Sequence, residues 1–178
     1  MPYIRVLLFL ILLLAPVVAN AQSFGLYASA GPTITDAGNS FAAGAGFSPT
    51  SQLSFVFSLE RTHLSSRTIR DRNTVSNFRG GTLLLGAAEV RFAPFGRGRV
   101  GPFALAGIAA GVSRPNVNDV FPDPVTNDAR AFFFGGGIDV PLADRLSVFA
   151  DARMTVGTEG YDGLVAVAPL RAGVAWRF

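Results

Sequence analysis

The chain of 178 residues contains no cysteine and no lysine, and it has only one histidine and one tryptophan. Without cysteine it forms no disulfide, although small secreted domains commonly use disulfides when their core is thin. A fold of this kind needs another source of stability, such as a closed network of backbone hydrogen bonds. All fifteen basic residues are Arg, whose guanidinium group makes bidentate contacts to carboxylates and phosphates.

Several functional classes have no signature in this sequence. The formal net charge of +3, which falls by one if Arg5 is removed, is too small an excess to indicate nucleic-acid binding. No Gly-rich phosphate loop, nucleotide-binding fingerprint or paired-Cys metal motif occurs. We therefore expect no cofactor, no metal and no nucleic-acid partner.

The first 21 residues have the three parts of a secretory signal peptide. Arg5 supplies the basic start, residues 6–18 form an uncharged apolar run, and residues 19–21 read Ala-Asn-Ala, the small side chains that a signal peptidase accepts. The apolar run is shorter than the roughly 20 residues that a transmembrane helix needs. We predict cleavage after Ala21, export of the chain, and one mature domain over residues 22–178.

The mature chain has no sustained helical period and instead contains strand-like segments separated by turn residues. We predict eight strands, over residues 24–31, 41–48, 53–64, 82–95, 100–112, 131–140, 146–156 and 165–178. Tight connections containing Pro, Gly or Asp alternate with connections that are on average longer, and the longest span residues 65–81 and 113–130. Transmembrane barrels have this alternation of short periplasmic turns and longer outer loops.

Within the strands, an apolar face opposes a face that carries charge. The last strand directs Val174 and Trp176 to one side and Arg171 to the other, because strand side chains alternate between faces. Eight charged residues collect on the second face: Glu60, Glu89, Arg91, Asp139, Asp151, Arg153, Arg171 and Arg177. Side chains fill the narrow interior of an eight-stranded barrel, so we predict a lumen plugged by paired charges. In a soluble protein the same charges would face water, and alternation alone does not separate the two interpretations.

The signal peptide, the eight strands, the Gly-rich segment 101–111 and the terminal sequence Arg-Ala-Gly-Val-Ala-Trp-Arg-Phe together resemble the outer-membrane β-barrel domain family, which includes OmpX-like proteins and the OmpA transmembrane domain. The resemblance implies an all-β fold, an eight-stranded antiparallel up-and-down transmembrane β-barrel in the outer membrane of a Gram-negative bacterium. It also implies that Trp176 and Phe178 form the signal read by the barrel-assembly machinery. We expect a monomer without catalytic activity that acts in envelope structure or surface interaction.

Arginines crowd in or beside the second outer loop, with only Asp71 among them to balance their charge. They are Arg61, Arg67, Arg70, Arg72 and Arg79. Guanidinium groups at the outer rim are suited to clamp the phosphates of lipopolysaccharide. A solvated polar loop explains the same composition, and both interpretations stay open.

Functions from other classes are alternatives to this account. A lipid-modifying enzyme needs a nucleophile and a base, and the single histidine, His63, has Glu60, Ser65 and Ser66 close in sequence. A soluble periplasmic lipocalin-like barrel would instead bind an apolar ligand. A membrane barrel with a narrow conducting channel is a further alternative.

Overall fold

The computed structural model describes residues 23–34, 38–65, 67–71, 74–78, 80–117, 125–159 and 163–178. The regular structure in these residues is all β: β1 (Ser23–Pro32), β2 (Asn39–Ser48), β3 (Leu53–Leu64), β4 (Arg67–Asp71), β5 (Thr74–Phe78), β6 (Gly81–Phe92), β7 (Gly101–Pro115), β8 (Asn127–Ala143), β9 (Leu146–Glu159), β10 (Gly163–Val167) and β11 (Leu170–Arg177). The described part of the chain contains no helix that is both long and apolar enough to cross a membrane. The predicted signal peptide, residues 1–21, lies outside the described residues.

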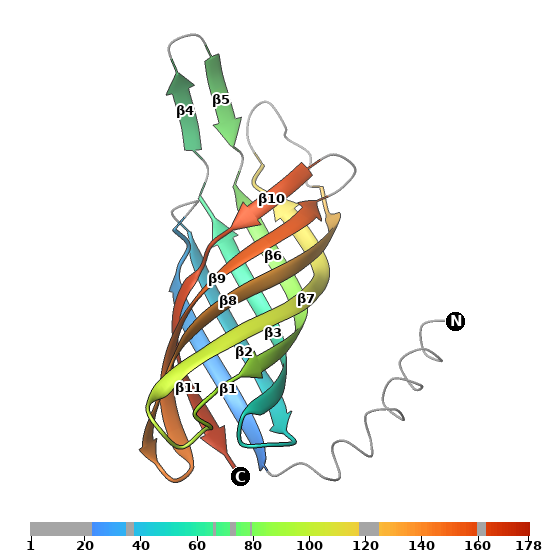
Figure 1. Cartoon of the computed structure of the whole chain (residues 1–178). Helices are drawn as coiled ribbons and strands as arrows, with labels where there is room; N and C mark the ends of the chain where they lie inside the picture. The colour runs from blue at the N-terminus through green and yellow to red at the C-terminus, as the bar shows by residue number, and fades with distance from the viewer. Residues whose placement is uncertain are drawn as a thin grey trace, which may run out of the picture.

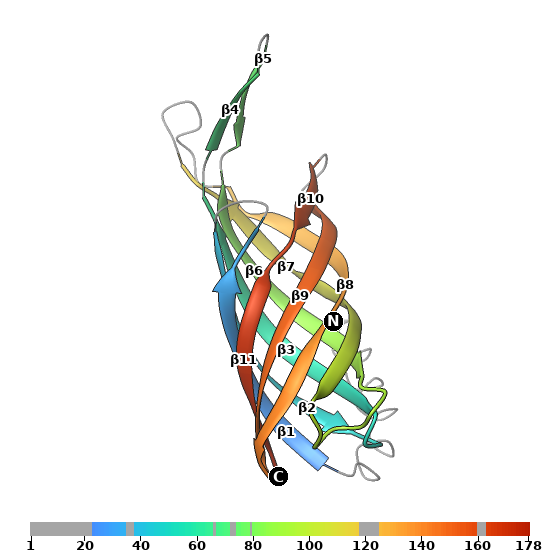
Figure 2. The same cartoon turned by 60° about the vertical axis from the view of Figure 1, so that its left-hand side comes forward.

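Antiparallel pairing closes the main sheet into a barrel (Figure 1). Neighbouring strands pair in the order β1, β2, β3, β6, β7, β8 and β9, and β11 pairs with both β9 and β1. Because β10 also pairs with β9, β10 and β11 together occupy the position of the eighth strand of the barrel. The strands are steeply tilted in both views (Figures 1 and 2), as closure of a sheet requires. The predicted eight-stranded antiparallel fold is confirmed.

Short turns join the strands at the end of the barrel that holds the C-terminus (Figure 1). They connect β2 to β3, β6 to β7 and β8 to β9. In the β6–β7 turn Gly96 and Gly98 have φ values of 76° and 97°, which side chains other than Gly rarely adopt. The other connections leave from the opposite end, and the one between β3 and β6 contains β4 paired with β5. The connections at the C-terminal end are shorter on average, as predicted, although the β6–β7 turn, residues 93–100, is longer than the β1–β2 connection, residues 33–38.

The strand bounds differ from the sequence prediction at most strand ends, and the largest differences concern β7, β8 and the last predicted strand. β7 continues to Pro115 and β8 begins at Asn127, which shortens the third outer loop. β8 also continues through a register shift between Pro141 and Ala143, since a bulge accepts a residue that has no N–H to donate. The last predicted strand is divided into β10 and β11 around Pro169, because proline has no N–H to donate to the neighbouring strand. The hairpin of β4 and β5 was not predicted.

The outer face of the barrel is apolar. Its exposed side chains include Leu26, Phe41, Phe57, Leu59, Leu84, Val90, Ile108, Phe132, Phe134, Ile138, Met154, Leu170, Val174 and Trp176. A soluble monomer rarely exposes an apolar surface of this extent, whereas a transmembrane barrel turns such a band towards lipid. The polarity of the fold is therefore that of a membrane barrel.

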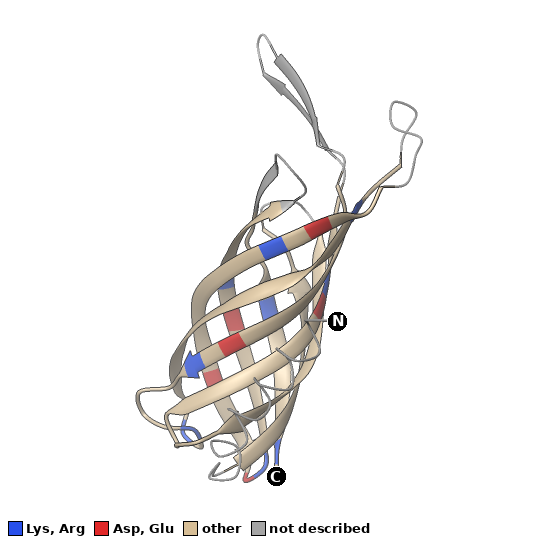
Figure 3. Cartoon of the chain, turned by 90° about the vertical axis from the view of Figure 1, so that its right-hand side faces the viewer, with Lys and Arg blue, Asp and Glu red and all other residues tan. Residues whose placement is uncertain are grey.

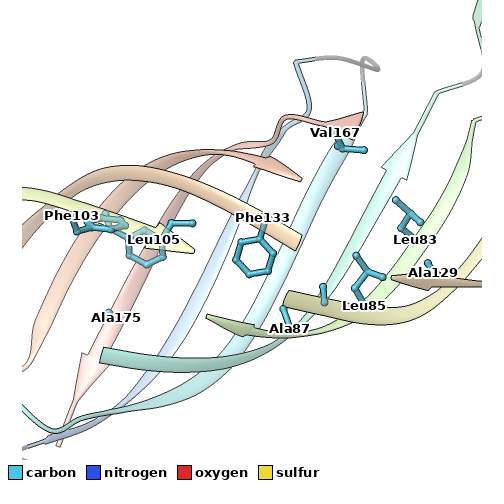
Figure 4. Packing of buried hydrophobic residues seen from close by; sticks show 11 residues of the cluster. Leu83, Leu85, Ala87, Phe103, Leu105, Ala129, Phe133, Val167 and Ala175 are labelled. Atoms are coloured by element: carbon cyan, nitrogen blue, oxygen red, sulfur yellow. The ribbon is translucent and has the colours of Figure 1, made fainter. Parts of the chain in front are cut away.

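Buried apolar side chains line the barrel interior towards both ends (Figure 4). Leu83, Leu85 and Ala129 lie towards the end opposite the C-terminus, and Phe103 and Ala175 lie towards the C-terminal end. Three inward phenylalanine rings each lie against a glycine that is their direct cross-strand partner. The pairs are Phe133 with Gly107, Phe103 with Gly137, and Phe149 with Gly173. The missing side chain of each glycine makes room for a ring that a narrow barrel could not otherwise hold.

Candidate functional site

Six charged side chains from four strands meet inside the barrel, between the two apolar ends. They are Glu60 on β3, Glu89 and Arg91 on β6, Asp151 and Arg153 on β9, and Arg171 on β11, and we call them the central cluster. All except Arg91 are at most 5% exposed. Acidic and basic residues occupy similar heights on strands in the middle of the barrel (Figure 3).

Each guanidinium group of the central cluster has a carboxylate partner. Arg171 is bidentate to Asp151, with Nε 2.9 Å from Oδ1 and Nη2 3.0 Å from Oδ2. Arg153 donates through Nη2 to Oε2 of Glu60, and Arg91 donates through Nε to Oε1 of Glu89. The three carboxylates balance the three guanidinium groups, which matters because a buried charge without a partner is strongly destabilising.

Longer contacts join these three pairs into one network. Arg171 Nη1 lies 3.7 Å from Glu60 Oε2, and Arg171 Nη2 lies 4.0 Å from Glu89 Oε2. Arg153 Nη1 lies 3.9 Å from Glu89 Oε2. Glu60 and Glu89 are thus each approached by more than one guanidinium group, so removal of one member changes the electrostatics of the whole cluster.

Neutral side chains complete the surroundings of the central cluster. Ser40 Oγ donates to Glu60 Oε1 at 3.0 Å, and Thr62 Oγ1 donates to the same oxygen at 3.2 Å. The guanidinium carbon of Arg153 lies 4.5 Å from the centre of the Phe133 ring. The aromatic face attracts this cation, which is only 4% exposed.

Arg91 is surrounded by aromatic rings as well as by its carboxylate partner. Its guanidinium carbon lies 4.8 Å from the ring centre of Phe149, 5.2 Å from that of Phe103 and 5.3 Å from that of Tyr27. These rings come from β9, β7 and β1, so they hold Arg91 across the width of the barrel.

The two other predicted lumen charges form a separate pair nearer the C-terminal end. Arg177 Nη2 lies 2.8 Å from Asp139 Oδ2 and also donates to Ser147 Oγ at 3.1 Å. The structure therefore directs all eight predicted residues inwards but divides them into the central cluster of six and this pair of two. Alternation along the strands cannot reveal this division, because it depends on how far neighbouring strands are staggered.

Small cavities lie on both sides of the central cluster. The outer cavity is lined by residues that include Glu60, Thr62, Leu83, Leu85 and Thr155. The inner cavity, at the C-terminal end, is lined by Tyr27, Ser54, Arg91, Ala93, Arg97, Phe103, Asp139, Phe149, Ala175 and Arg177. Each has a volume of about 30 Å³, enough for about two water molecules.

Two of the residues considered for catalysis, His63 and Glu60, lie on opposite faces of β3. His63 is exposed on the outer face, where Nδ1 lies 3.5 Å from Thr82 Oγ1. Glu60 points inwards, since residues three positions apart on a strand face opposite sides. Ser66 lies outside the described residues. Among the described residues, no group of three or more His, Asp or Glu side chains is arranged to hold a metal ion.

Of the predicted lipopolysaccharide contacts, only Arg61 has a described side chain. It is exposed on the outer face of β3, with Phe41 and Leu84 as its cross-strand neighbours. The side chains of Arg67, Arg70, Arg72 and Arg79 lie outside what the structure describes.

Both aromatic residues of the predicted assembly signal are exposed on the outer face at the C-terminal end. Trp176 lies on β11, opposite Leu26 of β1 and Leu146 of β9. Phe178 follows the strand, and its backbone N–H donates to the carbonyl of Phe24 at 2.9 Å. The chain terminus is thereby hydrogen-bonded to the beginning of β1.

Arg97 is a half-buried charge that the strand pattern does not identify. It lies in the β6–β7 turn, where Nη2 donates to the carbonyls of Thr50 and Leu53 and Nε donates to the carbonyl of Ser51. Burial lowers the pKa of its guanidinium group. Arg99, in the same turn, is exposed, and no sequence signal distinguishes the two.

No protein-family model and no curated protein sequence matches the chain. Among solved structures, Neisserial surface protein A (NspA) is similar with a TM-score of 0.66 and 15% sequence identity, covering 88% of this chain and 97% of that one. The N-terminal β-barrel domain of Pseudomonas aeruginosa OprF is similar with a TM-score of 0.62 and 13% identity, covering 89% and 98%. A major outer membrane protein from Thermus thermophilus has a TM-score of 0.51 at 15% identity, covering 88% and 98%. The fold is therefore that of the small outer-membrane β-barrels.

Proposed function

We propose that the protein is a small outer-membrane barrel of a Gram-negative bacterium, with a plugged lumen and a role in envelope structure or surface interaction. The observation that carries the proposal is the inverted polarity of the strands. On β3, Leu59 is 69% exposed on the outer face, whereas the adjacent Glu60 is 3% exposed inside. A soluble lipocalin-like barrel would need the opposite arrangement, with apolar side chains inside and polar side chains towards water.

In this proposal the central cluster closes the lumen to solutes. Its charges balance, its members contact one another across four strands, and the cavities beside it hold only about two water molecules each. A solute would have to separate several buried ion pairs to pass, and each separation leaves uncompensated charges in a region of low dielectric constant.

The proposed partners follow from the two rims of the barrel. The barrel-assembly machinery reads Trp176 and Phe178, which are exposed at the C-terminal end. Lipopolysaccharide binds at the opposite rim, where Arg61 presents a guanidinium group beside apolar neighbours. The barrel is a monomer in this proposal, since pairing of β1 with β11 closes the main sheet within one chain and no second copy is needed to complete it. We propose no catalytic role, because His63 and Glu60 lie on opposite faces of β3.

Planar-bilayer recording tests the plug. The wild-type protein should insert without steady single-channel steps. A Glu60→Ala, Arg153→Ala double variant, which removes one buried pair without changing the net charge, should show them. An Arg99→Ala variant, altered only in an exposed turn, should behave like wild type. Steady conductance from the wild-type barrel would refute the plug while leaving the membrane location intact.

A further inference from the structure

The inner cavity carries more positive charge than its carboxylates balance. Three guanidinium groups line it, those of Arg91, Arg97 and Arg177. Arg91 is paired with Glu89 and Arg177 with Asp139. Arg97 has no carboxylate partner among the described residues, and its bonds go to backbone carbonyls. One of the three cations that line the inner cavity is therefore left without an anion.

Two guanidinium N–H groups around the inner cavity also lack acceptors. Nη1 of Arg97 and Nε of Arg177 are buried and have no hydrogen-bond partner in the described part of the chain. Their other nitrogens are engaged, because Arg97 donates to the β2–β3 turn and Arg177 Nη2 donates to Asp139 and Ser147. A buried donor without an acceptor is destabilising, and more so when it is charged.

The electrostatics of Arg97 agree with a missing anion. Burial lowers the pKa of its guanidinium group, and the positive charge of Arg177 lowers it further. Tyr27 and Asp139 act in the opposite direction without offsetting the effect of burial. A negative charge in the cavity would stabilise both guanidinium groups and accept their two free hydrogen bonds.

The size of the inner cavity selects the kind of anion. Its volume of about 30 Å³ holds about two water molecules. A single-atom halide occupies little more space than one water molecule and therefore fits the cavity as it stands.

We propose that the inner cavity is a binding site for one halide ion, chloride under ordinary conditions, held by Arg97 and Arg177. The bound ion would connect the β6–β7 turn to the end of β11, and Arg97 already connects that turn to the β2–β3 turn. Chloride would therefore link the two turns and the end of β11 at this end of the barrel. The site goes beyond the proposed function and does not depend on whether the central cluster blocks conduction.

Chloride NMR line broadening tests the site in the mature chain, folded in zwitterionic detergent micelles. The excess linewidth of the chloride signal over protein-free micelles should saturate with concentration and be displaced by bromide. Arg97→Gln should weaken chloride affinity roughly tenfold or more, because a charge-assisted hydrogen bond is lost. Arg99→Gln, an equal charge change at an exposed position of the same turn, should keep the wild-type affinity. An equal loss in both variants would mean diffuse surface attraction and would overturn the proposal.

A second measurement stands if Arg97→Gln fails to fold, which its mobility on an unboiled gel reveals. Crystals of the wild-type protein grown with bromide should show an anomalous peak in the inner cavity, within hydrogen-bond distance of Arg97 Nη1 and Arg177 Nε. A cavity that contains only water at high bromide concentration would overturn the site, and so would an empty cavity.

Discussion

Arg171 and Asp151 are direct cross-strand partners on β11 and β9, and their side chains form a bidentate ion pair inside the barrel at 2.9 and 3.0 Å. The pair lies on the strand that closes the barrel. A slip of one residue in the register of β11 would turn Arg171 to the outer face and leave Asp151 buried alone. The ion pair therefore ties the register of closure to a buried electrostatic contact.

Removal of one partner of this pair should be strongly destabilising. Asp151→Asn leaves Arg171 buried opposite a neutral group and should lower the free energy of unfolding by about 3–5 kcal/mol. Urea unfolding in lipid vesicles, followed by the fluorescence of the single tryptophan, measures the change. The double variant Asp151→Leu, Arg171→Met should recover most of the loss, since an apolar pair of similar volume replaces both charges. Arg99→Ala is the control. An Asp151→Asn variant with the free energy of unfolding of the wild type would refute the view that the ion pair stabilises the barrel.

The glycine–phenylalanine pairs should be sensitive to volume in both directions. Phe149→Ala opens a cavity and should lower the free energy of unfolding by about 3–5 kcal/mol. Gly173→Ala should lower it by about 1–3 kcal/mol, because the new methyl group overlaps the Phe149 ring and the neighbouring strand backbone. The double variant Gly173→Ala, Phe149→Leu should lose less free energy of unfolding than the sum of the losses in Gly173→Ala alone and Phe149→Leu alone. Strictly additive effects would show that the ring and the glycine are not coupled.

The terminal aromatic residue should affect assembly in cells more than intrinsic stability. Phe178→Ala should reduce the fraction of folded barrel in the outer membrane, while refolding of the purified chain in micelles is nearly unchanged. Phe95→Ala is a matched control, since Phe95 is also exposed and lies at the same end of the barrel. If both variants assemble equally well, Phe178 is not part of an assembly signal.

The outer rim should bind phosphate-bearing lipid through Arg61. Arg61→Gln should weaken binding of lipopolysaccharide to the micelle-embedded protein by roughly three- to tenfold, with a smaller dependence on salt. Arg99→Gln removes the same charge at the opposite end of the barrel and should have no effect. Equal binding by wild type and Arg61→Gln would assign lipopolysaccharide recognition to other residues.

The sequence predicts the strands well because alternation is a local property. In β9, every second residue from Ser147 to Arg153 is buried and those between them face outwards, as the chain order alone implies. The break between β10 and β11 at Pro169 could have been predicted, because proline has no backbone N–H to donate to a neighbouring strand. The hairpin of β4 and β5 could not have been predicted, because its residues show no clear alternation of apolar and polar side chains.

The interior contacts could be predicted only in part. Alternation predicts which charges point inwards, but partner choice depends on the stagger between strands that are distant in sequence. Glu60 and Arg153 meet across the barrel although 93 positions separate them. Arg97 escaped prediction for a related reason, since the conformation of a turn decides whether its side chain enters the barrel or faces water.

Fractionation of expressing cells, with the membrane fraction run on a gel with and without boiling, tests the central claim most directly. We expect the mature chain in the outer membrane, and we expect its mobility to shift on heating because a closed barrel resists detergent until it is boiled. Release of the protein by osmotic shock in a soluble form, with no shift on heating, would contradict the membrane barrel.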